Sequence, residues 1–213
     1  MSPGVLVPLR VGHEPGAVDL VAAEAAAGDF LAALGIELDG EGLRGTPGRM
    51  ARAYAEMFRA RPFDLTTFPN DEGYDELVVA RSLPVLSVCE HHLLPFVGVA
   101  HVGYLPGERI LGLSKLARVV EHFARRPQVQ ERLTQQVADW LHTQLSPRGV
   151  GVVVEAEHLC MTVRGVQAAG STTVTSALHG ELRANAASRA EFFALALRGE
   201  PAGAGHGAAE VAS

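Results

Sequence analysis

Cysteine is scarce in this sequence, with only Cys89 and Cys160 among 213 residues. Two thiols cannot build the disulfide framework of a small secreted protein. The sequence also lacks an apolar run near the ~20 residues that a membrane helix needs. Its first residues, MSPGVLVPLR, lack the pattern of a secretory signal. We therefore expect a protein of the reducing cytoplasm with no membrane partner.

Basic residues are not in surplus either. The formal net charge is −6, which argues against a nucleic-acid partner and requires any anionic ligand to be bound by a few local groups. Lysine occurs only at Lys115, against a strong preference for arginine. Either a compact ammonium group is needed at this position or a surface lysine has survived by chance.

The chain is long enough for one domain with its own hydrophobic core. We expect disordered tails at residues 1–18 and 199–213, because both have little to bury. The single domain between them would span residues 19–198. Its first part, residues 19–62, should hold one helix at 19–34 and a second that begins at Thr46 as N-cap.

The core, residues 77–198, shows two strand patterns, two helix patterns and two further strand patterns. The predicted elements are strands at 83–89 and 96–105, a helix capped by Ser114, a helix from Pro127 to about Arg148, strands at 150–163 and 172–182, and a short helix at 189–197. This order predicts an α+β fold whose helices cover one face of a largely antiparallel sheet. Another subunit could cover the other face.

The stretch CEHH combines a thiol and an imidazole, the ligands that zinc prefers. Cys89 and His92 are three residues apart, which suits a tight turn. If residues 150–163 form a strand, its period of two places His158 and Cys160 on one face, so Cys160 would be the third ligand. Three ligands leave a position for water, whose pKa zinc lowers to about 7. The alternative is that both cysteines are small buried apolar residues.

Two further histidines lie next to these candidate ligands in the sequence. His91 and His158 would flank the metal, and because histidine titrates near neutral pH, each could transfer a proton.

A second group of residues suits an anion. Ser114 and Lys115 lie at a predicted helix start, where free N–H groups and the helix dipole favour phosphate, and Arg118 follows one turn later. Arg164 comes four residues after Cys160. Each charge alone is typical of a solvated surface, but together with a metal they favour a phosphorylated substrate.

Gln130 and Glu131 lie on the polar side of a predicted helix. A carboxylate accepts two parallel N–H bonds, which is what the Watson–Crick edge of guanine offers. An exposed glutamate more often faces solvent, and the spacing does not separate these two interpretations.

Several motifs resemble those of the GTP cyclohydrolase I family. They are CEHHLLPF, GLSKLARVV, ARRPQVQERLT, EAEHLCM, RGV and TVTSAL, between about Leu83 and Leu195, with a weaker match at TPGRMA. The resemblance implies the tunnelling fold (ββααββ) and a toroidal homodecamer with active sites between subunits. It also implies Zn2+-dependent conversion of GTP and water to formate and 7,8-dihydroneopterin triphosphate, the first step of pterin and tetrahydrofolate biosynthesis.

The same resemblance assigns roles to individual residues. It implies Cys89, His92 and Cys160 as zinc ligands. It further implies His91, His158 and Ser114 as catalytic residues, and Glu131, Gln130, Lys115, Arg118, Arg164 and Arg49 as contacts to GTP.

Two other functions stay open. A nitrile reductase of the same fold would use a free cysteine as nucleophile with a nicotinamide cofactor, although its signature is missing. A non-catalytic purine-binding protein would bind GTP without releasing formate. The sequence also departs from many relatives at His179, where they carry arginine, and in the loop QAAGS, both outside the matched motifs.

Overall fold

The computed structural model describes residues 9–11 and 16–197, so the predicted C-terminal tail at 199–213 and most of the N-terminal one lie outside the described residues. Within the predicted N-terminal tail, Leu9–Val11 forms strand β1, which pairs antiparallel with β2 (Phe63–Leu65). This part of the tail is therefore ordered, contrary to the prediction. The backbone partner that orders it lies more than fifty residues away, where local composition gives no signal.

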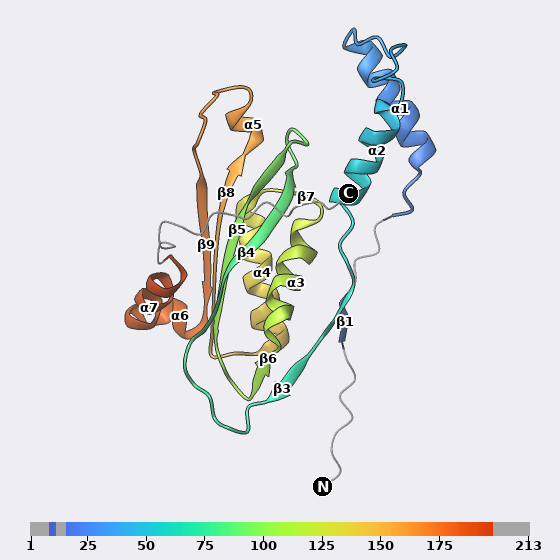
Figure 1. Ribbon diagram of the computed structural model, residues 1–213. Helices are drawn as coiled ribbons and strands as arrows, with labels where there is room; N and C mark the ends of the chain where they lie inside the picture. The colour runs from blue at the N-terminus through green and yellow to red at the C-terminus, as the bar shows by residue number, and fades with distance from the viewer. Residues whose placement is uncertain (1–8, 12–15, 198–213) are drawn as a thin grey trace, which may run out of the picture.

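A helical hairpin stands beside one end of the molecule (Figure 1). It consists of α1 (Leu20–Ala33) and α2 (Thr46–Met57). Asp19 caps α1 by accepting a hydrogen bond from the Ala22 N–H at 2.9 Å. Thr46 is not the N-cap of α2 as predicted: Gly45 holds that position, and the Thr46 hydroxyl instead accepts a hydrogen bond from Arg49.

The core is a five-stranded sheet in the order β7-β4-β5-β8-β9. All neighbouring strands are antiparallel except β7 and β4, which are parallel. A two-stranded sheet, β3-β6, lies at the lower end of this body in Figure 1. The strands are β3 (Thr67–Pro69), β4 (Val78–Cys89), β5 (Pro95–Leu105), β6 (Arg109–Leu111), β7 (Pro127–Gln128), β8 (Gly149–His158) and β9 (Thr173–His179).

Helices α3 (Leu113–Ala124) and α4 (Gln130–Leu145) cover one face of this sheet, as predicted (Figure 1). Their apolar sides bury residues such as Leu116, Val119, Leu133 and Leu141 against alternate side chains of β5 and β8, among them Tyr104. This packing forms the main core of an α+β fold.

Both helices begin elsewhere than predicted. Gly112 rather than Ser114 is the N-cap of α3, because the chain leaves β6 at Leu111 and the Gly112 N–H still bonds to the Thr66 carbonyl. The helix predicted from Pro127 begins only at Gln130, because Pro127–Gln128 pairs with the end of β4 as strand β7.

Two short helices pack against the other face at one end. These are α6 (Gly180–Ala184) and α7 (Ala186–Ala196), and Phe192 of α7 is fully buried there. Its ring lies over Gly103 and Gly151, where an added Cβ would come within 3.0 Å of the ring atoms. Two glycines facing each other in register thus make room for one aromatic ring.

The predicted strand at 150–163 is shorter than expected. β8 ends at His158, and residues Leu159–Thr162 form the short helix α5. No helix in the described part of the chain has the length and apolar character needed to cross a membrane.

Candidate metal centre

The candidate centre begins with the turn that joins β4 to β5. The Leu93 N–H donates to the Cys89 carbonyl at 2.8 Å, and the Cys89 N–H donates to the Leu94 carbonyl at 2.9 Å. Leu93 adopts a left-handed conformation with φ of 53° to close the turn. Tyr54 of α2 donates its hydroxyl to the Leu93 carbonyl at 3.0 Å, so the helical hairpin contacts the segment that carries Cys89 and His92.

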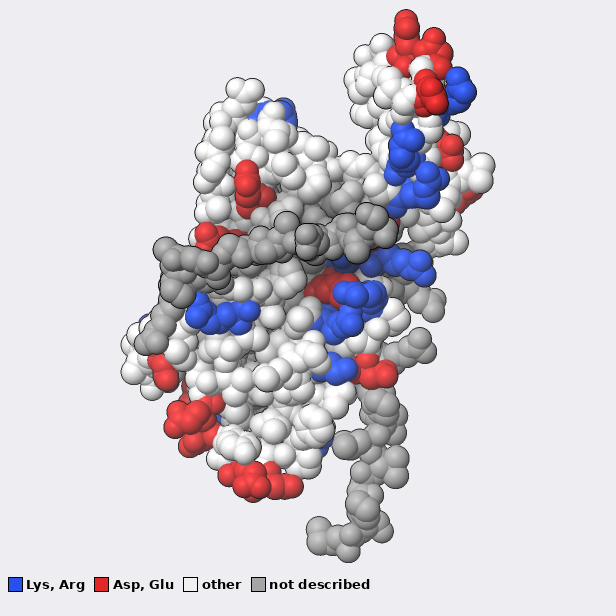
Figure 2. All heavy atoms as spheres, viewed as in Figure 1, with Lys and Arg blue, Asp and Glu red and all other residues white. Residues whose placement is uncertain are grey.

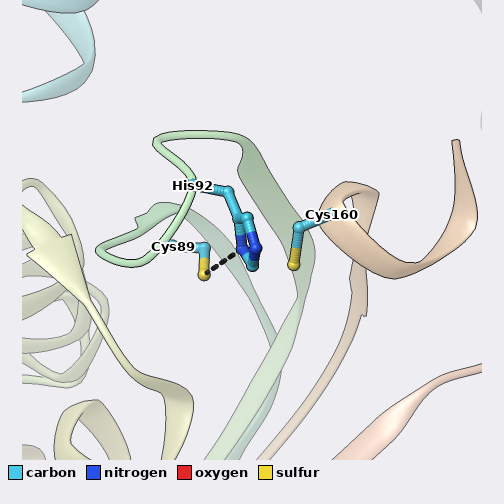
Figure 3. Close-up of side chains that lie close together, drawn as sticks. All are labelled: Cys89, His92 and Cys160. Atoms are coloured by element: carbon cyan, nitrogen blue, oxygen red, sulfur yellow. Dashed lines mark hydrogen bonds between the residues drawn. The ribbon is translucent and has the colours of Figure 1, made fainter. Parts of the chain in front are cut away.

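Three side chains converge at this turn (Figure 3). The ligand atoms of Cys89, His92 and Cys160 all lie within 4.8 Å of one another, and the Cys89 Sγ is 3.9 Å from the His92 Nδ1. Cys160 lies in α5 and not in β8. The prediction that His158 and Cys160 share one face of a strand is therefore wrong. The step from β8 into α5 brings it to the site instead.

The donor set fits a divalent metal ion. Two thiols and an imidazole are ligands typical of zinc. Burial raises the pKa of the Cys160 thiol, and the neighbouring Cys89 raises it further, while the Arg164 guanidinium acts in the opposite direction. A cation bound between two adjacent sulfurs stabilises their thiolate forms.

The three candidate ligands Cys89, His92 and Cys160 are called the metal group from here on. They form one wall of a pocket of about 300 Å³. This volume is at the low end of the roughly 300–1,000 Å³ found for ligand sites. The pocket gathers seven predicted site residues: Cys89, His91, His92, Gln130, Glu131, His158 and Cys160.

Strand pairing explains how distant segments meet at this pocket. Cys89 is in register with Gln128 of β7, which brings the start of α4 beside the metal group. His158 is in register with Phe96 of β5, and the two rings stack with centroids 4.6 Å apart and planes 12° apart.

The polar groups of the pocket differ in exposure. Gln130 is 1% exposed, and its side chain bonds to the His158 Nε2 at 2.7 Å. Glu131, in the first turn of α4, is exposed. Burial lowers the pKa of His158, and the negative charge of Glu131 acts in the opposite direction.

The predicted anion-binding residues do not line this pocket. Ser114 and Lys115 lie at the start of α3 and Arg118 lies at its middle, whereas Cys89 lies near the end of this helix, which with twelve residues is about 18 Å long. Arg118 bonds to Glu121 at 3.1 Å, and the same carboxylate binds Arg61. Within a single chain, these three residues therefore do not share the pocket with Cys89, His92 and Cys160.

The two remaining arginines are also outside the pocket lining. Arg164 follows α5, near Cys160. Arg49 lies on α2 and donates to the Gly42 carbonyl at 2.6 Å and to Thr46 at 2.8 Å. Figure 2 shows basic side chains along the side of the molecule formed by α2 and α3, interrupted by acidic ones, with further acidic side chains at the top of the α1–α2 hairpin and at the lower left of the view.

Sequence reasoning missed part of the pocket. Gln128, Val129, Met161 and Thr173 also line it. None of these four residue types by itself indicates metal binding or acid–base catalysis. The aromatic stack of Phe96 on His158 could have been found, because it follows from pairing the two strands in antiparallel register.

The fold and the site define an α+β protein with a Cys–His–Cys group that has the geometry of a metal site, beside a small polar pocket. Residues 23–197 match the family model described as GTP cyclohydrolase I. The chain belongs to the GTP cyclohydrolase I family.

Individual relatives agree with this assignment. A protein named GTP cyclohydrolase 1 from Mycobacteroides abscessus is 55% identical, over 88% of this chain and 95% of its own length. A protein of the same name from Mycolicibacterium paratuberculosis is 54% identical, over 87% and 94%. The crystal structure of an apo archaeosine synthase QueF-like protein gives a TM-score of 0.40 at 20% identity, over 49% of this chain and 93% of that one. That last similarity is too low to carry an argument.

Proposed function

We propose that this chain is an enzyme that hydrolyses GTP to formate and 7,8-dihydroneopterin triphosphate with Zn2+ as its cofactor. One observation carries the proposal: the ligand atoms of Cys89, His92 and Cys160 converge within 4.8 Å beside a pocket that Glu131 and His158 also line. Family membership supplies the reaction. The product would be the first pterin of a biosynthetic route to tetrahydrofolate or related compounds.

Zinc bound by these three residues would supply an activated water and a Lewis acid at neutral pH. The protein contributes binding and proton transfer around it. Glu131 presents an exposed carboxylate at the pocket wall, where it can accept two N–H bonds from guanine. Opening the imidazole ring of the purine needs an acid at a ring nitrogen, and His158 and His91 line the same pocket for that role.

The phosphate contacts would come from a second subunit. Ser114, Lys115 and Arg118 lie on α3 outside the pocket lining, with Ser114 and Lys115 at the helix end that is remote from Cys89. If they bind the ribose and triphosphate, the active site lies between subunits, in line with the proposed homodecamer. Arg164, near Cys160, and Arg49 on α2 would add further phosphate contacts. The two free thiols suit a cytoplasmic enzyme.

The test is turnover of GTP by the purified protein. Formate and the fluorescent oxidised pterin are measured with the protein as prepared, after chelation, and after adding back Zn2+. We expect both products from the first and third samples and neither from the second. Binding of GTP without formate in the zinc-loaded sample would refute the proposed function and favour a purine-binding protein.

A further inference from the structure

Gln130 is almost fully buried, at 1% exposed, although the sequence suggests that it contacts a substrate. A buried amide must place both its N–H groups and its oxygen against matching partners. The hydrogen bonds around Gln130 therefore determine which of its two terminal atoms faces the pocket.

The amide nitrogen of Gln130 points into the sheet. Its Nε2 lies 3.0 Å from the Val154 carbonyl and 2.8 Å from the Thr173 carbonyl. Both carbonyls can only accept, so the atom facing them must be the NH2 group and not the oxygen.

A neighbouring pair of hydroxyls supports the same orientation. The Thr134 hydroxyl donates to the Gln130 backbone carbonyl at 2.8 Å, which uses its only hydrogen. In the 2.6 Å contact between Thr134 and Thr175, the donor must then be Thr175. Thr175 Oγ1 is left as an acceptor, and it lies 3.2 Å from the Gln130 Nε2.

With the nitrogen so placed, the Gln130 Oε1 faces the His158 Nε2 at 2.7 Å. An amide oxygen carries no hydrogen, so the His158 Nε2 must donate. Neutral His158 is thereby held as the Nε2–H tautomer, and its other ring nitrogen, Nδ1, is the one able to accept a proton. Stacking on Phe96 at 4.6 Å fixes the plane of the same ring.

We propose that Gln130 is a positioning residue that holds His158 in the Nε2–H tautomer, and that it does not bind the guanine base. The inference deepens the proposed function and rests on it in one respect: in that reaction, the orientation of the His158 ring would matter for turnover. Glu131, the next residue, keeps its own place at the exposed wall of the pocket.

The tautomer is measured directly by nitrogen-15 NMR of the zinc-loaded protein with labelled histidine. The difference spectrum against His158→Gln assigns the two His158 nitrogens. We expect a protonated, pyrrole-type Nε2 and an unprotonated, pyridine-type Nδ1. The opposite pattern would overturn the proposal, and this readout requires neither turnover nor a variant of Gln130.

A kinetic test uses Gln130→Met, which keeps the side-chain length and removes both polar groups. We expect mixed tautomers, a kcat lower by about 10–100-fold and a Kd for GTP changed by less than about threefold. Gln128→Met is the matched control: Gln128 is equally buried but has no bond to His158, so the His158 signals should not move.

A higher Kd for GTP with an unchanged kcat in Gln130→Met would contradict the proposal and return Gln130 to guanine binding. If the unmodified protein releases no formate from GTP, the proposed function fails, while the NMR pattern still decides the tautomer.

Discussion

Glu131 carries guanine recognition in the proposed reaction, and it does so from an exposed position at the start of α4. Replacing it by alanine should weaken GTP binding by about 10–100-fold, as expected for the loss of ~1.5–3 kcal/mol of hydrogen bonding to a charged group. Calorimetric titration with GTP measures this change. Because Glu131 is not among the three candidate ligands, zinc content should stay at the wild-type level, and a loss of zinc would contradict the assigned role.

His101 offers a pH test away from the metal centre. It is 7% exposed, and burial, followed by the charge of Arg81, lowers its pKa, while Glu155 acts in the opposite direction. The folded state thus binds fewer protons at this site than the unfolded state. Protonation of His101 should leave the free energy of unfolding unchanged above the unfolded-state pKa of about 6.5. Below this pH, the free energy of unfolding should fall as the pH decreases.

Thermal unfolding of the wild type and of His101→Gln between pH 7.5 and 5.5 measures this contribution. The melting temperature of the variant should fall less than that of the wild type over that interval. Equal losses in the two proteins would show that His101 does not contribute to the pH dependence.

At the level of secondary structure, the approach of β5 to β8 depends on Gly98. An added Cβ there would lie 2.0 Å from the Glu155 carbonyl oxygen and 2.5 Å from the Ala156 Cα. Both are backbone atoms of the neighbouring strand, so no flexible side chain can give way.

Gly98→Ala should therefore lower the free energy of unfolding by about 1–3 kcal/mol or more. Gly42→Ala is the control, since nothing lies within 4 Å of its added Cβ, and it should change stability by less than about 0.5 kcal/mol. Denaturant unfolding followed by circular dichroism compares them. Equal stability of the two variants would mean that the strands separate at Gly98 without cost.

The central strands and helices could be predicted because their apolar residues recur with clear periods, as in β5, α3 and α4. Element ends were harder to predict, because long-range pairing decides them. Pro127–Gln128 becomes a strand only because β4 lies beside it. The metal group was predicted from CEHH and a second cysteine, although the element that carries Cys160 was not.

The buried role of Gln130 could not be predicted from the sequence. It arises from two carbonyls and two hydroxyls on β8, β9 and α4, which become neighbours only in the folded sheet. In the sequence, a glutamine next to a glutamate at a helix start is equally consistent with two residues that both contact a ligand. The contacts of His179 could not be predicted either: it bonds to Asp139 at 2.7 Å and stacks on His142.

At the scale of the whole molecule, the separation of the pocket from the start of α3 predicts shared active sites. A chain with Glu131→Ala has a defective pocket, and a chain with Lys115→Ala has a defective phosphate contact. In co-expressed mixed oligomers, some sites should combine the intact pocket of one chain with the intact Lys115 of another. Random mixing should restore about one quarter of the wild-type activity.

Formate release by the mixed oligomers, compared with each variant alone, measures this complementation. Light scattering on the same samples gives the oligomer mass, which should be that of ten chains. Activity no higher than the mean of the two single variants would contradict active sites between subunits.

The proposed reaction depends most on Cys89, His92 and Cys160 holding one catalytic zinc ion. The most direct measurement is zinc content per chain and formate release on the same preparations of the wild type and Cys160→Ser. We predict about one zinc per wild-type chain with turnover of GTP, and the loss of both in the variant. A zinc-free Cys160→Ser protein that still releases formate from GTP would contradict the account.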